Sequence, residues 1–518
     1  MSIVLLEHPR PKNHKRFADV VNTPLSSCLM TGYIASVLKT NDINTEVVDA
    51  NLLGWSFSKT IQELKTRKFR LLGVHLVYLW EKTEEVFEML ADLRKEGVHA
   101  HINLFGHFPT FAYRDILLNY PFVDSITVGE PEVTIQELSK AIITCQGKPD
   151  LRTIDGLAFH TYSSGSKNGK AMTGHHLINI HRNDLPQKAE TVKTNPRSVV
   201  SNLDTLPSPF RYNFEIVKKR GIATYILGSR GCYGICTFCY LDRFYGDDST
   251  WRGRSPENVF EEIVGIYRDF GETYFYFADA NFFGPGRKGK ERAATFARLM
   301  IDKGLQIRFG IECRVNDIEA QSLNLLVEAG LKNVFLGVES GSQKSLNRLK
   351  KQTTVEENKR AIRMLRHHKI EPNYGFIMFE PDSTLCDVRE NFEFLKEMEM
   401  LRKPSITAHL LYHQQAIFKG MADYETRKED AESVSKFHYE YRYHLRDENV
   451  ALLAERVNGF CLDILNRLSG ERFGEKGTLS CDYDEEDSIS KELNQELINY
   501  FEKSLSSLEN NKSYDRLR

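Results

Sequence analysis

Short runs of apolar, β-branched residues alternate with helix-like stretches through the first 145 residues. Five runs have the length and composition of strands: SIVLLE, TEVVDA, RLLGVHLVY, AHINLFG and DSITVG. Helices are predicted between them at 26–39, 57–66, 81–96 and 110–119, with one more after Pro131. This alternation is typical of a parallel sheet with helices on both faces. We therefore predict an N-terminal Rossmann-like (flavodoxin-like) α/β domain over residues 1–145.

A second alternating series begins at Thr224, after a polar, turn-rich segment (146–215) that predicts a hairpin and a linker. Its strands are predicted at 224–228, 273–278, 306–312, 333–337, 372–379 and 404–411, and its helices near 256–269, 288–303, 317–329, 355–368 and 384–398. Six such units predict a partial (β/α)6 barrel over 216–415. Residues 416–518, including FHYEYRYHLR, predict a helical C-terminal region with a disordered tail.

Composition narrows the class of protein. The formal net charge is -2, and no polybasic tract suggests nucleic-acid binding. No apolar stretch reaches the roughly 18 residues that a membrane span requires. The apolar start of the chain soon meets His8 and Pro9, which is too short for a signal peptide. We therefore expect a cytoplasmic protein that binds neither membranes nor nucleic acids.

Three of the nine cysteines lie within eight positions, at Cys232, Cys236 and Cys239, just after the first strand of the second series. In a reducing compartment, clustered thiols bind metal or perform chemistry more often than they form disulfides. A structural zinc site needs four protein ligands, and any fourth ligand here would be remote in sequence. A [4Fe–4S] cluster can be held by three thiolates, which leaves one iron open to a small molecule. Both metal sites remain open on spacing alone.

The C-x3-C-x2-C spacing, with Phe238 before the last cysteine, resembles the signature of the radical SAM superfamily. The segments GSRGC, WRGRSPENVFEEI, YFADANFFG, GVESGS and GFIMFEPDST are similar to that superfamily's successive barrel strands. With the α/β domain ahead of it, the chain resembles the branch that has an N-terminal cobalamin-binding-like domain, over residues 1 to about 400. The resemblance implies a [4Fe–4S] cluster on the three cysteines, S-adenosyl-L-methionine on the open iron, and cobalamin. It also implies a 5′-deoxyadenosyl radical that abstracts hydrogen from an unactivated carbon.

Candidate contacts in the N-terminal domain lie at the carboxyl ends of its strands, where ligands bind on such sheets. No G-x-G-x-x-G follows the first strand, so a dinucleotide is disfavoured. The segment DANLLG places Asn51 where cobalamin domains with D-x-H-x-x-G carry the cobalt-ligating histidine, so we do not expect a cobalt ligand from that motif. The expected cofactor contacts are His8, Asn51, Gly106, His107, Pro109, Thr110, Gly129 and Glu130.

The resemblance also suggests cofactor contacts in the barrel, each with a packing or salt-bridge alternative. Adenine contacts are expected around Phe238 and Tyr240. The other candidates are Asp279, Asn281, Glu312, Arg314, Glu339 and Ser340, at strand ends that would face methionine, ribose or cobalamin. The catalytic residue is unknown, with Glu380, His409 and His413 as candidates. The two histidines would share one face of the predicted last strand.

The resemblance favours an enzyme that transfers a methyl group to an unactivated carbon of a small biosynthetic intermediate. The first alternative is a non-methylating radical reaction: a rearrangement, cyclisation, dehydration or epimerisation. An iron–sulfur sensor or scaffold is the alternative from another class. The expected partners are a small-molecule substrate and an external electron donor such as flavodoxin or ferredoxin.

Overall fold

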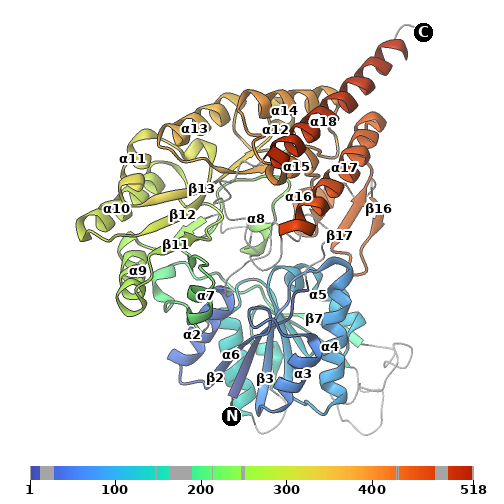
Figure 1. Ribbon diagram of the computed structural model, residues 1–518. Helices are drawn as coiled ribbons and strands as arrows, with labels where there is room; N and C mark the ends of the chain where they lie inside the picture. The colour runs from blue at the N-terminus through green and yellow to red at the C-terminus, as the bar shows by residue number, and fades with distance from the viewer. Residues whose placement is uncertain are drawn as a thin grey trace.

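The computed structural model describes residues 2–11, 29–145, 149–162, 189–212, 214–246, 251–427, 429, 431–472 and 488–515. Three bodies are visible in Figure 1: an N-terminal α/β domain in blue and cyan, a second α/β domain in green and yellow, and C-terminal helices in orange and red. No helix in the described ranges combines the length and apolar character needed to cross a bilayer.

The N-terminal sheet contains the five predicted strands. They are β1 (Ser2–Glu7), β2 (Thr45–Asp49), β3 (Phe69–His75), β4 (His101–Phe105) and β5 (Ser125–Thr127), all parallel in the order β2-β1-β3-β4-β5. This is the flavodoxin-like strand order. Helices α2 (Leu29–Thr40), α3 (Phe57–Lys65), α4 (Thr83–Lys95), α5 (His107–Asn119) and α6 (Glu132–Thr144) connect the strands. The residues of β1 from Ile3 to Leu6 are fully buried, as expected of a parallel strand covered on both faces.

An antiparallel hairpin extends this sheet beyond β5. It consists of β6 (Leu157–Tyr162) and β7 (Ala189–Lys193). The linker then passes a short 3-10 turn (Leu203–Thr205) and α7 (Phe214–Lys219). The segment predicted as hairpin and linker therefore adds two strands to the first sheet.

The second α/β domain has a five-stranded parallel sheet. Its strands are β8 (Thr224–Ile226), β11 (Tyr274–Phe277), β12 (Arg308–Arg314), β13 (Leu331–Glu339) and β14 (Asn373–Phe376), in the order β14-β13-β12-β11-β8. The connecting helices are α9 (Pro256–Phe270), α10 (Gly286–Lys303), α11 (Ala320–Glu328), α12 (Gln343–Arg348), α13 (Val355–His367) and α14 (Leu385–Glu397). The Ser255 hydroxyl accepts from the Asn258 amide at 3.2 Å, so α9 begins at the expected N-cap and proline.

The prediction of a sixth strand at 404–411 is wrong. Residues Pro404–Tyr412 form helix α15 instead, and only a parallel bridge between Phe379 and Gln414 continues the sheet. Pro404 stands at the first helical turn, where its fixed φ favours a helix. The apolar residues that resembled a strand, among them Leu410 and Leu411, are buried against the core of the second domain.

The C-terminal region is not wholly helical. A small antiparallel sheet joins β15 (Ile417–Phe418), β17 (Glu440–Tyr443) and β16 (Ala431–Val434), so part of FHYEYRYHLR is a strand. Phe437 and Tyr439, just before β17, belong to the hydrophobic core of the N-terminal domain. This long-range contact outweighs the local preference of the run for a helix.

The remaining C-terminal elements are helices that extend the second domain. They are α16 (Ala422–Thr426), α17 (Glu448–Arg472) and α18 (Ser488–Asp515), and residues of α17 and α18 share the core of the second domain. Because α18 continues to Asp515, most of the tail that was expected to be disordered is helical.

Candidate active site between the two α/β domains

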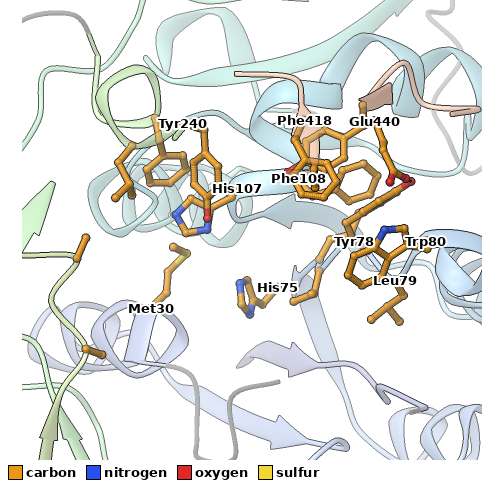
Figure 2. A pocket seen from close by; sticks show the side chains of 18 of the residues that line it. Met30, His75, Tyr78, Leu79, Trp80, His107, Phe108, Tyr240, Phe418 and Glu440 are labelled. Atoms are coloured by element: carbon orange, nitrogen blue, oxygen red, sulfur yellow. The ribbon is translucent and has the colours of Figure 1, made fainter. Parts of the chain in front are cut away.

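A cavity of about 1110 Å³ lies where the N-terminal domain, the second domain and the small C-terminal sheet meet. Figure 2 shows His75, Tyr78 and His107 of the N-terminal domain facing it together with Tyr240 of the second domain and Phe418 of the C-terminal sheet. Its volume exceeds the roughly 300–1,000 Å³ of ordinary small-ligand pockets. The cavity can therefore hold more than one ligand.

The three cysteines lie on a loop between β9 (Ser229–Gly231) and the short α8 (Leu241–Phe244), and Gly231 and Tyr240, on either side of them, line the cavity. A hairpin of β9 with β10 (Trp251–Gly253) supports the start of the loop. Burial raises the pKa of the Cys232 thiol and raises that of Cys239 to about 12, and the charge of Cys236 adds to both shifts. The thiols thus lie close enough to repel one another as thiolates.

Within the described residues, no three histidine, cysteine or acidic side chains converge as a single metal ion would require. An iron–sulfur cluster differs from a single ion, because each of its thiolates binds a different iron. The positive irons would also supply the charge that buried thiolates need.

Arg314, from the end of β12, contacts the cysteine loop. Its Nη1 lies 3.4 Å from Cys236 Sγ, and a Cβ on Gly234 would come within 2.5 Å of the same nitrogen. Glycine at position 234 thus lets the guanidinium reach the thiol. Arg314 was expected to contact methionine or ribose, and in the structure its guanidinium lies against Cys236, one of the expected cluster ligands.

Of the two aromatic residues expected at adenine, Tyr240 lines the cavity and Phe238 is half-buried outside its lining. The Tyr240 ring lies 5.0 Å from the His107 ring, which also lies 4.2 Å from Phe244. Burial lowers the pKa of His107 to about 3, so this histidine is neutral. His107 and Tyr240 join the two domains at the cavity wall.

Hydrogen bonds of Thr110 join the segments GHFPT and GEPE. The Thr110 hydroxyl donates to the Gly106 carbonyl at 2.7 Å and accepts from the Gly129 amide at 3.1 Å. Both glycines have positive φ, 119° and 83°, which favours glycine. Pro109 is buried inside α5.

Two expected contacts lie away from the cavity lining. His8 is fully buried, its Nδ1 lies 2.7 Å from the Pro9 carbonyl, and its Nε2 accepts from the Val77 amide at 3.2 Å. Asn51 follows β2 at the edge of the sheet, and its carbonyl accepts from the Gly54 amide at 3.1 Å. Both residues stabilise turns in this structure.

Glu130 lines the cavity, but its carboxylate joins the two domains. It forms ion pairs with Arg230 at 3.0 Å and Arg252 at 2.6 Å, both from the β9–β10 hairpin. Arg230 also pairs with Glu132 at 2.6 Å. We call Arg230, Arg252, Glu130 and Glu132 the interdomain latch.

Asp279 and Asn281 hold the turn after β11. Asn281 donates to Asp317 at 2.7 Å and accepts from the Gly284 amide at 2.6 Å. Asp279 accepts from the Gly228 amide at 3.2 Å, and burial raises its pKa to about 6. Neither residue lines the cavity, whereas their neighbours Ala278 and Ala280 do.

Glu312 shares one face of the second sheet with Tyr225 and Tyr276. The Tyr276 hydroxyl donates to Glu312 at 3.3 Å, and the two tyrosine rings lie 5.6 Å apart. A Cβ on Gly310 would come within 2.5 Å of the Tyr276 ring, so glycine there lets the ring cross β12. Burial raises the pKa of Glu312 to about 7, which makes it a group that exchanges protons near neutral pH.

Glu339 and Ser340 end β13 with different partners. Glu339 has φ 64° and pairs with Lys351 at 2.8 Å, while the Ser340 hydroxyl donates to Asn391 at 2.7 Å. Ser340 is fully buried. Ser340 therefore supports the turn. Glu339 lies nearer to His413, because burial lowers the pKa of that histidine and the charge of Glu339 partly opposes the shift.

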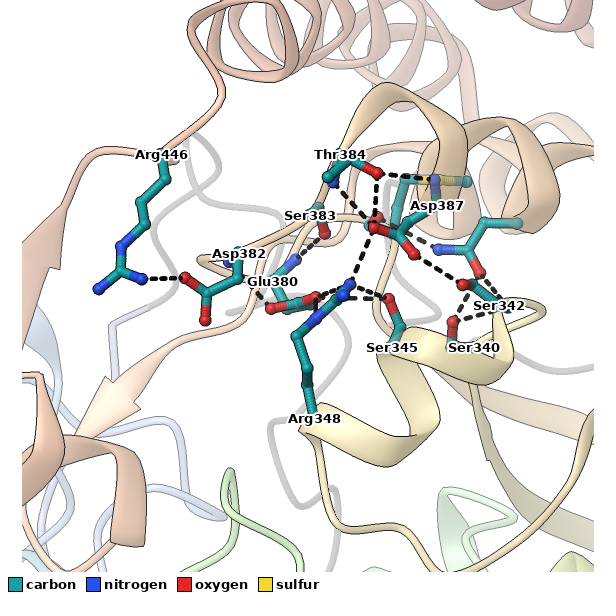
Figure 3. Close-up of polar contacts among 12 residues, drawn as sticks. Ser340, Ser342, Ser345, Arg348, Glu380, Asp382, Ser383, Thr384, Asp387 and Arg446 are labelled. Carbon is teal, nitrogen blue, oxygen red and sulfur yellow. Dashed lines mark hydrogen bonds and ion pairs between the residues drawn. The ribbon is translucent and has the colours of Figure 1, made fainter.

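Glu380 is held inside a polar network shown in Figure 3. Its carboxylate lies 2.5 Å from Arg348 and accepts from the Asp382 amide at 2.9 Å. Arg348 also pairs with Asp387 at 3.0 Å. These contacts anchor Glu380 in the segment before α14, and its side chain is not part of the cavity lining.

His409 lies in the last turn of helix α15 and His413 caps its C-terminus, so the two residues stand one helical turn apart and not on a strand. Their rings are 5.1 Å apart, and burial lowers the pKa of both, that of His409 to about 3. Only His413 lines the cavity. Its carbonyl accepts from the Met378 and Phe379 amides at 3.0 and 3.1 Å, which fixes it at the end of β14.

Comparison with known proteins agrees with this geometry. A family model described as the radical SAM superfamily matches residues 226–395. The chain carries a radical SAM domain. The solved structure of OxsB, a cobalamin-dependent S-adenosylmethionine radical enzyme with aqua-cobalamin bound, is similar over 98% of this chain and 72% of its own, with a TM-score of 0.72 and 18% identity. The radical SAM domain and its N-terminal α/β companion thus have the fold expected for this branch.

Two curated relatives carry enzyme names. An anaerobic magnesium-protoporphyrin IX monomethyl ester cyclase of Synechocystis is 28% identical over 274 residues, 51% of this chain and 47% of its own. An uncharacterized methyltransferase of Pyrococcus horikoshii is 24% identical over 406 residues, 77% of this chain and 79% of its own. The match spans about half the length of the cyclase. The expectation of an enzyme is confirmed.

The sequence analysis did not identify several residues that line the cavity. They are His75, Tyr78, Arg230, Glu132, Tyr225 and the run from Tyr439 to Tyr443. His75 ends β3 in the structure but lies inside the longer predicted run RLLGVHLVY, so the overlong strand prediction concealed its position. The C-terminal run carries no such signal, because only the tertiary fold brings it to the cavity.

Proposed function

We propose that this protein is a cobalamin-dependent radical SAM enzyme that methylates an unactivated carbon of a small biosynthetic intermediate. The observation that carries the proposal is the shared cavity, which the cysteine loop and the strand ends of the N-terminal domain border together. When bound, the cluster, S-adenosylmethionine and cobalamin would supply the electron, the radical and the methyl group.

The residues of the chain would position these groups and exclude water. Cys232, Cys236 and Cys239 would hold the cluster, with the Arg314 guanidinium stabilising the thiolate of Cys236. The interdomain latch fixes the cysteine loop against the N-terminal domain. Aromatic residues of the small C-terminal sheet cover the cavity and would limit the size of the substrate.

Glu312 and His413 are two groups of the second domain that could exchange protons with a substrate. Glu312 faces the inside of the radical SAM domain beside Tyr276, and its pKa of about 7 allows it to take up or release a proton near neutrality. His413 lies at the cavity itself. Either side chain could accept a proton that the substrate loses.

An external flavodoxin or ferredoxin would deliver the electron. Ile235, within the cysteine loop, is 52% exposed, so the loop reaches the surface. A cytoplasmic location belongs to the same proposal, because the cluster requires reducing conditions. The second candidate function is a non-methylating radical reaction, which the similarity to a relative named as a cyclase favours.

Two measurements test the proposal. Anaerobic reconstitution should give about four irons and four sulfides per chain, and the triple Cys→Ala variant should lose the charge-transfer absorption. Protein from cobalamin-supplemented cells should retain cobalamin and transfer label from methyl-deuterated S-adenosylmethionine to product. Retained cobalamin with 5′-deoxyadenosine and an unlabelled product would support the second candidate. A protein that binds no cobalamin would exclude the methylation mechanism.

A further inference from the structure

Arg314 ends β12, and its guanidinium is buried beside the cysteine loop, with the residue 4% exposed. Its Nη1 lies 3.4 Å from Cys236 Sγ, and its Nη2 donates to the Lys351 carbonyl. Its Cζ lies 5.4 Å from the centre of the Tyr233 ring, within the range of a cation–π contact. A sulfur, a carbonyl and an aromatic ring thus fix the side chain.

These contacts do not compensate the charge of Arg314 while Cys236 is a neutral thiol. Among the residues that the structure describes, no carboxylate pairs with Arg314, and its Nε has no hydrogen-bond partner. The nearby carboxylate of Asp317 accepts instead from the Tyr233 hydroxyl at 2.6 Å and the Asn281 amide at 2.7 Å. Buried charges are costly unless an opposite charge pairs with them. The site therefore requires an anion at Cys236, which is an expected cluster thiolate.

Lys351, a second buried cation beside the cysteine loop, is already compensated. It is 4% exposed, and its Nζ pairs with Glu339 at 2.8 Å. Its segment adjoins the cysteines, because the Thr237 amide of the cysteine loop donates to the Leu349 carbonyl at 3.1 Å. Of these two cations, Arg314 is the one whose charge remains for the cluster.

A buried cation at a cluster ligand changes the energy of electron transfer to the cluster. One electron from an external donor converts [4Fe–4S]²⁺ to [4Fe–4S]⁺, which adds one negative charge. The potential of this step depends on net charge, on hydrogen bonds to the sulfurs and on solvent exposure. The N–H donor and the positive charge of Arg314 both stabilise the reduced state. Because the guanidinium is buried, water screens its charge weakly.

We propose that Arg314 is a positioning residue that raises the reduction potential of the [4Fe–4S] cluster through its contact with Cys236. The proposal rests on the cluster of the proposed function, and it gives Arg314 a role that does not require S-adenosylmethionine. The guanidinium makes the cluster easier for a flavodoxin or ferredoxin to reduce. Its planar fork also fixes the sulfur, since it bonds Cys236 and the Lys351 carbonyl together.

The first test measures the midpoint potential of the reconstituted full chain without S-adenosylmethionine. Dithionite is the reductant, and electron paramagnetic resonance measures the reduced cluster. At a fixed potential, Arg314→Met should lower the ratio of reduced to oxidised cluster about tenfold or more, which is about 59 mV for each factor of ten. Arg314→Lys keeps the charge and should recover most of the shift. Arg243→Met is the matched control, because it removes an exposed cation of α8 and should leave the potential unchanged.

The second test needs no substitution to detect the contact. In protein labelled with ¹⁵N only in arginine, electron–nuclear double resonance of the reduced cluster should show a coupled ¹⁵N nucleus. Arg314→Lys should remove this coupling. If Arg314→Met holds no cluster, the arginine label decides the matter.

Equal potentials in Arg314→Met and the unsubstituted protein would overturn the proposal, and so would the absence of a ¹⁵N coupling. A potential that falls in Arg314→Met and is not recovered in Arg314→Lys would show that packing and not charge sets it, which also overturns the proposal. All three results leave the proposed function standing. If no [4Fe–4S] cluster forms on the unsubstituted protein, the proposed function fails first.

Discussion

Arg230 of the interdomain latch lies two residues before Cys232 and pairs with two buried carboxylates. Arg230 is 6% exposed, and its carboxylate partners Glu130 and Glu132 are 6% and 1% exposed. Glu130 has a second cation, Arg252, at 2.6 Å. Among the described residues, Glu132 has no cationic partner besides Arg230. Removing Arg230 therefore leaves one carboxylate compensated and the other uncompensated.

The expected cost follows from that asymmetry. Arg230→Leu should lower the free energy of unfolding by about 3–5 kcal/mol, the usual cost of leaving one member of a buried ion pair alone. Adding Glu132→Leu removes the uncompensated charge and should restore most of the loss, because apolar replacement of a whole buried pair is often neutral or stabilising by about 1–4 kcal/mol. Because the latch adjoins the cysteine loop, Arg230→Leu should also lower the iron content after reconstitution, and the double variant should recover it.

Urea unfolding followed by tryptophan fluorescence measures the first effect, and iron analysis measures the second. Arg268→Leu is the matched control, since its ion pair with Asp269 is exposed and its loss should cause no measurable change. The reasoning is refuted if Arg230→Leu costs less than about 1 kcal/mol. It is equally refuted if the double variant is no more stable than Arg230→Leu alone.

Three further substitutions test other parts of the site. Burial raises the pKa of Glu312 from 4.5 to about 7, so between these values the folded state binds a proton that the unfolded state has lost. The free energy of unfolding therefore falls as the pH rises through this range, by about 3 kcal/mol between about pH 5 and pH 8. Glu312→Gln should remove this pH dependence, as measured by chemical unfolding at each pH. Gly106→Ala should lower the free energy of unfolding by about 1–3 kcal/mol, because Gly106 has φ 119° and a Cβ there would come within 2.9 Å of the His75 ring; an unchanged urea midpoint would contradict this reasoning. Arg348→Met should lower the urea midpoint by leaving the buried Glu380 without its guanidinium, while the iron content after reconstitution stays the same; a loss of iron at unchanged stability would instead indicate a direct role in the site.

The sequence alone determined the two strand–helix series and the place of the metal-binding chemistry. Local signals suffice for these features. Buried parallel strands appear as short apolar runs, Ser255 and Pro256 mark a helix start, and three cysteines at fixed spacing lie on one loop whatever surrounds it. The strand order of the N-terminal sheet also followed, because short crossover connections allow few arrangements.

Only the tertiary structure decided which polar residues face the cavity. His8 and His75 both stand near the end of a strand, yet one is enclosed by backbone groups and the other lies on the cavity floor. Glu130 and Glu380 have the composition of site residues, but arginines distant in sequence bind them both. The sequence does not distinguish a carboxylate or imidazole that contacts a ligand from one that contacts another residue of the protein.

Long-range packing likewise decided the sixth unit and the small C-terminal sheet. The apolar residues around Leu410 suit a buried strand or a buried helix equally well, and the space left beside β14 accommodates a helix. The aromatic run from Phe437 to Tyr443 has no core of its own, so it became a strand only by packing on the N-terminal domain. These outcomes depend on contacts between segments tens to hundreds of residues apart, which no local pattern records.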